Sequence, residues 1–153
     1  MRMWKSILVV TVVAMLLATL AVGRWPRTSG AGQATAEPAA DTGKIAWLTS
    51  LPEALEAARA EHKPILVDFF ATWCGPCRLM DEETWPQAEV VAAAGKYVAV
   101  RLDVDAHQQT AAQFDVTGIP TVVFLDASGK EKHRSVGFVD AAAMLELLSK
   151  HKP

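Results

Sequence analysis

Cysteine is scarce in this sequence: the 153 residues contain two, Cys74 and Cys77. Two cysteines cannot form the set of crosslinks that stabilises small disulfide-rich domains, and they supply half of the ligands that a tetrahedral zinc site needs. The four histidines are scattered, and none forms a second ligand pair. Because no histidine directly follows Cys77, the attachment motif of a c-type haem is excluded as well. We predict neither a metal site nor a cofactor.

An excess of positive charge is also missing. The chain has 15 Lys and Arg against 17 Asp and Glu, with a formal net charge of −2. No basic stripe is present of the kind that follows a nucleic-acid backbone, so we expect no nucleic-acid partner. Half of the residues are hydrophobic, which suits one domain with a sizeable core. We expect a monomer whose partners are proteins or small thiols.

The two cysteines stand in Trp73-Cys74-Gly75-Pro76-Cys77, directly after the apolar run Pro64–Phe70. A helix that opens just after Cys74 would point free backbone N–H groups at its sulfur and favour the thiolate. Cys77 would lie one turn further, within reach of a disulfide. The spacing therefore favours a redox dithiol. The alternatives are a two-thiolate metal carrier and a structural disulfide, which would gain little stability from so short a loop.

A long uncharged segment, Ile7–Val22, follows Arg2 and Lys5 near the N-terminus. Its length lies between that of a signal-peptide core and that of a membrane span, and a tryptophan stands on each side of it. We predict a signal-anchor over residues 1–27 rather than a cleaved signal, with the rest of the chain outside the cytoplasm. Residues 28–43 are rich in Ala, Gly, Thr, Pro and Ser, as expected of a flexible linker.

The remainder, residues 44–153, alternates strand and helix patterns. The expected strands, in chain order, are Lys44–Leu48, Pro64–Ala71, Tyr97–Val104, Thr121–Leu125 and Lys132–Val136. The expected helices are Leu51–Glu61 with Ser50 as its cap, Gly75–Glu83, Gln87–Ala94, His107–Phe114 and Asp140–Lys150. The order βαβαβαββα predicts an α/β domain with a mixed central sheet flanked by helices, and with its working end at the carboxyl ends of the strands.

Three motifs in this order resemble the thioredoxin superfamily. They are Val67–Cys77, Thr117-Gly118-Ile119-Pro120-Thr121 and Val136-Gly137, and the resemblance extends over Lys44–Lys150. Glu82-Glu83-Thr84-Trp85 and the strand Arg101–Val104 are similar to the C-terminal periplasmic domain of DsbD-type thiol:disulfide interchange proteins. The resemblance implies a thioredoxin fold and, with the N-terminal segment, a protein held in the inner membrane with its catalytic domain in the periplasm.

The resemblance also implies catalytic roles. Cys74 would attack a substrate disulfide and Cys77 would resolve the mixed disulfide that forms. Asp68, a charged residue inside an apolar strand, would have a raised pKa and exchange a proton with Cys77. The alternative is that Asp68 is a buried polar residue whose hydrogen bonds are satisfied and which has no part in the chemistry.

Five further residues are expected to bind substrate. The resemblance implies that Pro120 follows a cis peptide bond and leaves the backbone of Ile119 free to pair with an extended peptide, and the alternative is an ordinary trans proline in a turn. Trp73, Gly75 and Pro76 would form the surface beside the sulfur of the nucleophile.

The leading hypothesis is an extracytoplasmic thiol-disulfide oxidoreductase that reduces protein disulfides and receives electrons from a membrane or soluble thiol reductase. An oxidase or isomerase of folding proteins is the alternative among enzymes. The alternative that is not an enzyme is a module that passes a soft metal such as copper between thiolates.

Overall fold

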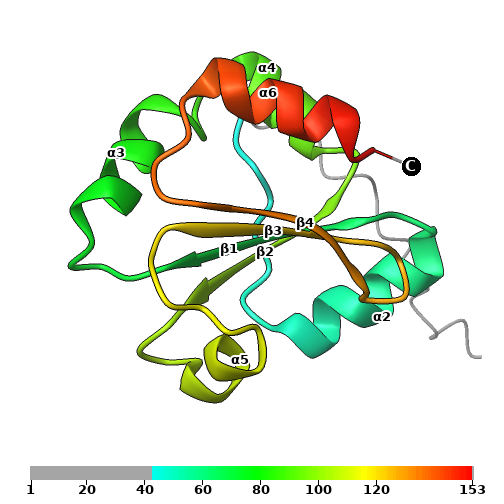
Figure 1. Ribbon diagram of the computed structural model, residues 1–153. Coiled ribbons are helices and arrows are strands. Elements are labelled where there is room, and N and C mark those ends of the chain that lie inside the picture. Colours follow the sequence, from blue (N-terminus) through cyan, green and yellow to red (C-terminus); the bar gives the residue numbers. More distant parts are fainter. Residues whose placement is uncertain (1–42, 153) are drawn as a thin grey trace, which may run out of the picture. The chain divides into compact units, whose positions relative to one another are not determined.

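The computed structural model describes residues 43–152, which form the α/β domain drawn in Figure 1. Its strands are β1 (Ile65–Phe70), β2 (Val98–Asp103), β3 (Thr121–Leu125) and β4 (Glu131–Val136). Its helices are α2 (Leu51–Glu61), α3 (Gly75–Glu83), α4 (Ala88–Ala94), α5 (Gln108–Gln113) and α6 (Ala141–Lys150). Apart from the first expected strand, Lys44–Leu48, the predicted elements therefore lie within a residue or two of their expected places.

The sheet has the order β2-β1-β3-β4. Strand β1 pairs in parallel with β2 and antiparallel with β3, which in turn pairs antiparallel with β4. This confirms the mixed sheet. Because β1 and β2 run in the same direction, their carboxyl ends meet at one end of the sheet, and the chain enters α3 from that end (Figure 1).

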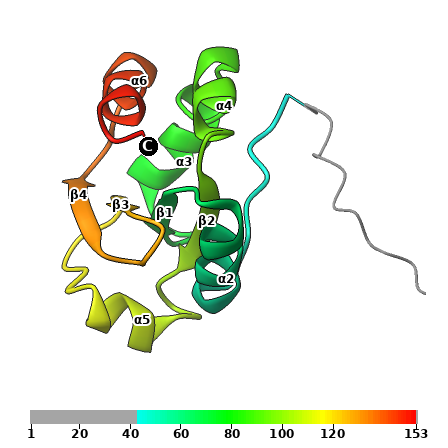
Figure 2. The same cartoon turned by 90° about the vertical axis from the view of Figure 1, so that its right-hand side faces the viewer.

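Helices cover both faces of the sheet, as the end-on view of Figure 2 shows. Alternate residues of β1 explain the two layers, because successive side chains of a strand point to opposite faces. Ile65, Val67 and Phe69 share one core with α2 and α5. Leu66 belongs to the other core, which α3, α4 and α6 cover. By the same alternation Asp68 points toward the α3 side.

The expected first strand, Lys44–Leu48, is wrong in extent. Leu48 alone pairs with the sheet: its N–H donates to the carbonyl of Ala99 and its carbonyl accepts from the N–H of Arg101. The side chain of Ser50, two residues later, already caps α2. The chain must therefore turn away from the edge of β2 before a ladder can form.

The signal-anchor expected over residues 1–27, and the linker as far as residue 42, lie outside the described residues. Within residues 43–152 no helix combines the length and the apolar character needed to cross a membrane.

Candidate active site

Cys74 is the N-cap of α3, as the spacing predicted. Its sulfur accepts a hydrogen bond from the backbone N–H of Cys77 at 3.2 Å, and the two residues form a disulfide with a Cα–Cα distance of 5.3 Å. Cys74 therefore stands at the N-terminus of a helix, a position whose free N–H groups stabilise a negative charge on sulfur.

Both sulfurs are nearly covered. Cys74 is 4% exposed and Cys77 is 2% exposed, and both pack against Ala71, Val104 and Ile119. Ile119, the residue before Pro120, thus contacts the cysteine cluster, although about 45 residues separate Ile119 from Cys74 in the sequence. The Ile119–Pro120 peptide bond is cis, as expected. Gly75 and Pro76 lie exposed on the first turn of α3.

Trp73 is 65% exposed beside the disulfide. Its indole N–H donates to the carboxylate of Asp105 at 2.7 Å, and the backbone N–H of Asp105 donates to the side chain of Asp103. The loop after β2 therefore holds the ring in place. Asp105 was not among the residues predicted from the sequence, because no local pattern relates it to a tryptophan 32 residues earlier.

Asp68 is buried, with 1% of its surface exposed, on the central strand β1. Burial raises the pKa of Asp68 to about 7, while the positive charge of Arg101 acts in the opposite direction. This confirms the raised pKa expected from the sequence.

Arg101 is the counterion that the sequence analysis missed. It lies opposite Asp68 in the register of β1 and β2, with its Nε 2.9 Å from Asp68 Oδ2. Its Nη1 lies 2.7 Å from Asp81 Oδ1, and its guanidinium covers the ring of Phe70 at 4.0 Å. A signal was available: Asp68 is the one charged residue of its strand, Arg101 is flanked by apolar residues in the next strand along the chain, and opposite charges in neighbouring strands tend to pair.

Asp81 also shows where Asp68 lies relative to the second cysteine. Cys77 and Asp81 are four residues apart on α3, so they share one face of that helix. The Arg101 guanidinium lies between Asp81 and Asp68, so the Asp68 carboxyl lies on the side of the sheet that α3 covers, the helix that carries Cys77.

Four large hydrophobic side chains stay exposed among the described residues, and all belong to segments around the cysteines or the Pro120 turn. They are Trp73, Leu79, Val136 and Phe138.

Comparison with known proteins agrees with this geometry. Residues 46–127 match the family described as Thioredoxin-like. The chain belongs to the thioredoxin-like family.

Its relatives include the thioredoxin of Chlamydia muridarum, which is 46% identical over 89 residues, or 58% of this chain and 82% of the relative. The thiol:disulfide interchange protein DsbD of Salmonella paratyphi A is 31% identical over 159 aligned positions, which take in 99% of this chain and 27% of the relative. Among solved structures, a DsbH oxidoreductase superposes with a TM-score of 0.60 at 30% identity, covering 69% of this chain and 83% of that one.

These relatives and the Cys74–Cys77 disulfide establish a thiol-disulfide oxidoreductase of the thioredoxin type. Protein disulfides are therefore its substrates.

Proposed function

We propose that this oxidoreductase works as a reductant of protein disulfides outside the cytoplasm, held to the inner membrane by its N-terminal segment. In the proposed cycle the Cys74 thiolate attacks one sulfur of a client disulfide, and the other client sulfur leaves as a thiolate. Cys77 then attacks Cys74, releases the second client thiolate and closes the Cys74–Cys77 disulfide. A thiol reductase must supply two electrons and two protons to restore the dithiol.

One observation carries the chemistry of this proposal: the buried carboxyl of Asp68 lies on the α3 side of the sheet, linked through Arg101 to Asp81, one turn after Cys77, and burial raises its pKa to about 7. A carboxylate with that pKa can accept the proton of the Cys77 thiol near neutral pH, when Cys77 must become a nucleophile. In the opposite direction the same acid returns the proton. Asp68 therefore assists the resolving step whichever way electrons flow.

The reducing direction is supported by Gly75 and Pro76, which stand between the two cysteines and resemble the pair found in reducing thioredoxins. The purified protein should reduce the disulfides of insulin with dithiothreitol as electron source. Its reduction potential should be near that of thioredoxin, roughly −270 mV, rather than that of DsbA, roughly −120 mV. A potential near the latter value, without insulin reduction, would favour the oxidase or isomerase alternative. Tight copper binding by the dithiol would favour the metal-handling module.

The location is supported by the uncharged run Ile7–Val22 behind Arg2 and Lys5, and by the similarity to DsbD across nearly the whole chain. After cell fractionation and a high-salt wash, the full-length chain should stay in the membrane pellet, and protease should reach its domain only from the outer side. A soluble mature form that begins near Arg24 would instead indicate a cleaved signal. Partners trapped in mixed disulfides would identify the donor and the clients.

A further inference from the structure

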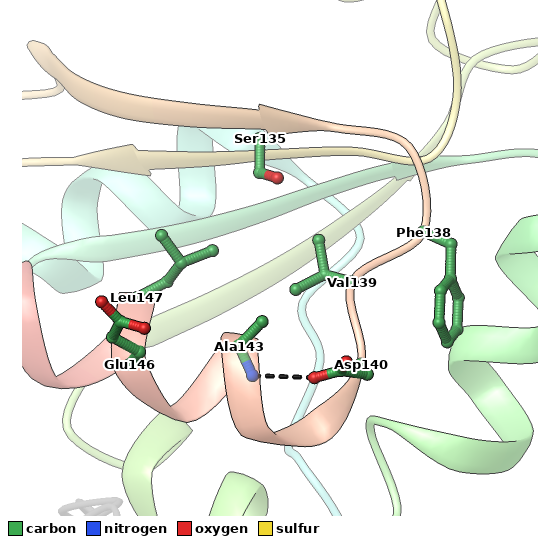
Figure 3. Close-up of a pocket in the computed structure, with 7 residues that line it drawn as sticks. All are labelled: Ser135, Phe138, Val139, Asp140, Ala143, Glu146 and Leu147. Carbon is green, nitrogen blue, oxygen red and sulfur yellow. Dashed lines mark hydrogen bonds between the residues drawn. The ribbon is translucent and has the colours of Figure 1, made fainter.

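A groove of about 370 Å³ lies between β4 and α6 (Figure 3). It is separate from the cysteine cluster and has no part in the chemistry described so far. Its lining comes from β4, from the first two turns of α6 and from the loop between them. The lining residues are Ser135, Phe138, Val139, Asp140, Ala143, Glu146 and Leu147.

The loop that forms one end of the groove is fixed on both sides of Phe138. Before it, the N–H of Gly137 donates to the carbonyl of Pro120 at 2.8 Å. After it, the carbonyl of Val139 accepts from the buried hydroxyl of Thr84, at the end of α3, at 2.7 Å. Phe138 is held between the Pro120 turn and α3 with 39% of its surface exposed. The groove therefore begins directly beside the turn that is expected to bind the client backbone.

The walls and the rim of the groove differ in character. Phe138, Val139 and Leu147 provide apolar surface, and Figure 3 shows the carboxylates of Asp140 and Glu146 along the α6 side. The Asp140 side chain caps α6 and accepts the N–H of Ala143 at 2.8 Å, so the helix N-terminus offsets part of its negative charge. In residues 43–152 no lysine, arginine or histidine forms an ion pair with the Asp140 or Glu146 carboxylate, although Lys150 follows Glu146 by one helical turn. Two carboxylates without an ion-pair partner thus border an apolar hollow.

We propose that this groove is a subsite for a lysine or arginine side chain of the client protein, a proposal that rests on the proposed function. The side chains of lysine and arginine combine a long apolar stem with a charged head. The stem would lie along Val139 and Leu147, and the charged head would lie in the negative potential of the Asp140 and Glu146 carboxylates. An aliphatic side chain would fill the hollow without satisfying its charges, and a glutamate would be repelled.

The test uses the reduced full-length chain and a series of peptides, each with one disulfide. The positions on either side of the disulfide are varied one at a time, and each carries lysine, norleucine or glutamate. The measurement is the second-order rate constant of a single turnover, followed by release of peptide thiols. At one or two positions the lysine peptide should react about fivefold faster than the norleucine peptide at low salt, as two partly exposed charge pairs would give. At about 0.5 M salt the preference should largely vanish.

Matched variants assign the effect to the groove. Asp140→Asn with Glu146→Gln should abolish the lysine preference, and asparagine preserves the helix cap. Glu56→Gln with Glu89→Gln changes the net charge equally on the exposed surfaces of α2 and α4 and should leave the preference intact. Equal rates for lysine and norleucine, or an equal loss of preference in both double variants, would overturn the subsite. If the wild-type protein reduces none of the peptides, the proposed reductant function fails instead.

Discussion

Arg101 and Asp68 are register partners on adjacent parallel strands, with Nε and Oδ2 2.9 Å apart. The N–H groups of Arg101 and Trp85 favour the charged form of Asp68, but no contact within residues 43–152 gives either carboxylate oxygen a well-aligned hydrogen bond. A buried carboxylate loses its hydration and regains only part of that free energy from such neighbours. For this reason the effect of burial exceeds that of Arg101, and the pKa of Asp68 is raised.

The first prediction concerns the stability of the oxidised protein as a function of pH. Because the folded-state pKa of Asp68 is about 7, against 3.8 as the ordinary value, the folded state holds its proton more tightly than the unfolded state does. The contribution of Asp68 to stability should therefore fall as pH rises from about 4 to 7 and stay low above that. Asp68→Asn should be about 1–3 kcal/mol more stable than wild type at pH 8, and the gain should shrink toward pH 4.

Urea unfolding of the two proteins across this pH range checks the prediction, and the resolving step should be slower in the variant. A variant that is less stable at pH 8 and still fully active would show that Asp68 is structural.

The second prediction concerns coupling between the two charges. Arg101→Met leaves the Asp68 carboxylate buried without its cation, so the free energy of unfolding at pH 8 should fall by about 2–4 kcal/mol. In the Asp68→Asn background, Arg101→Met should lower the free energy of unfolding at pH 8 by clearly less than it does in wild type. A double-mutant cycle measured by urea unfolding gives the coupling energy directly. Additive effects of the two substitutions would contradict the pairing.

The third prediction concerns the division of labour between the cysteines. With Cys77→Ser, attack by Cys74 still forms the mixed disulfide, but no resolving thiol remains. Complexes should accumulate as higher-mass species on non-reducing gels and collapse with reductant. They should be absent when Cys74 is also changed to serine. Trapping by Cys74→Ser but not by Cys77→Ser would reverse the two roles.

The fourth prediction concerns the exposed ring beside the disulfide. Asp105→Ala removes the acceptor of the Trp73 indole N–H, so the ring should become more mobile and the KM for a protein disulfide should rise by about two- to fivefold. The value of kcat and the melting temperature should change little, because the bond is at the surface. In a Trp73→Phe background, which has no indole N–H, Asp105→Ala should have no further effect. A large loss of stability would instead indicate that Asp105 maintains the loop after β2.

The sequence alone was enough to predict most helices and strands of the domain and its reactive cysteine pair. Continuous apolar runs and helical patterns locate β1, β3, α3 and α6 within a residue or two, because these patterns reflect local burial and capping. The placement of Cys74 at a helix start follows from the same local signals. The one misjudged strand, around Leu48, has a local β pattern, but its end is determined by the helix cap at Ser50.

Only the tertiary structure decided which residues surround the reactive pair. Ile119 packs against the cysteines, Asp105 holds Trp73, and Arg101 joins Asp68 to Asp81, although each of these contacts crosses a long stretch of sequence. The groove beside Phe138 exists because hydrogen bonds from the Pro120 turn and from Thr84 fix one loop. Local patterns describe how each segment meets water and its own backbone, whereas these contacts depend on the register of neighbouring strands and on the packing of helices onto the sheet.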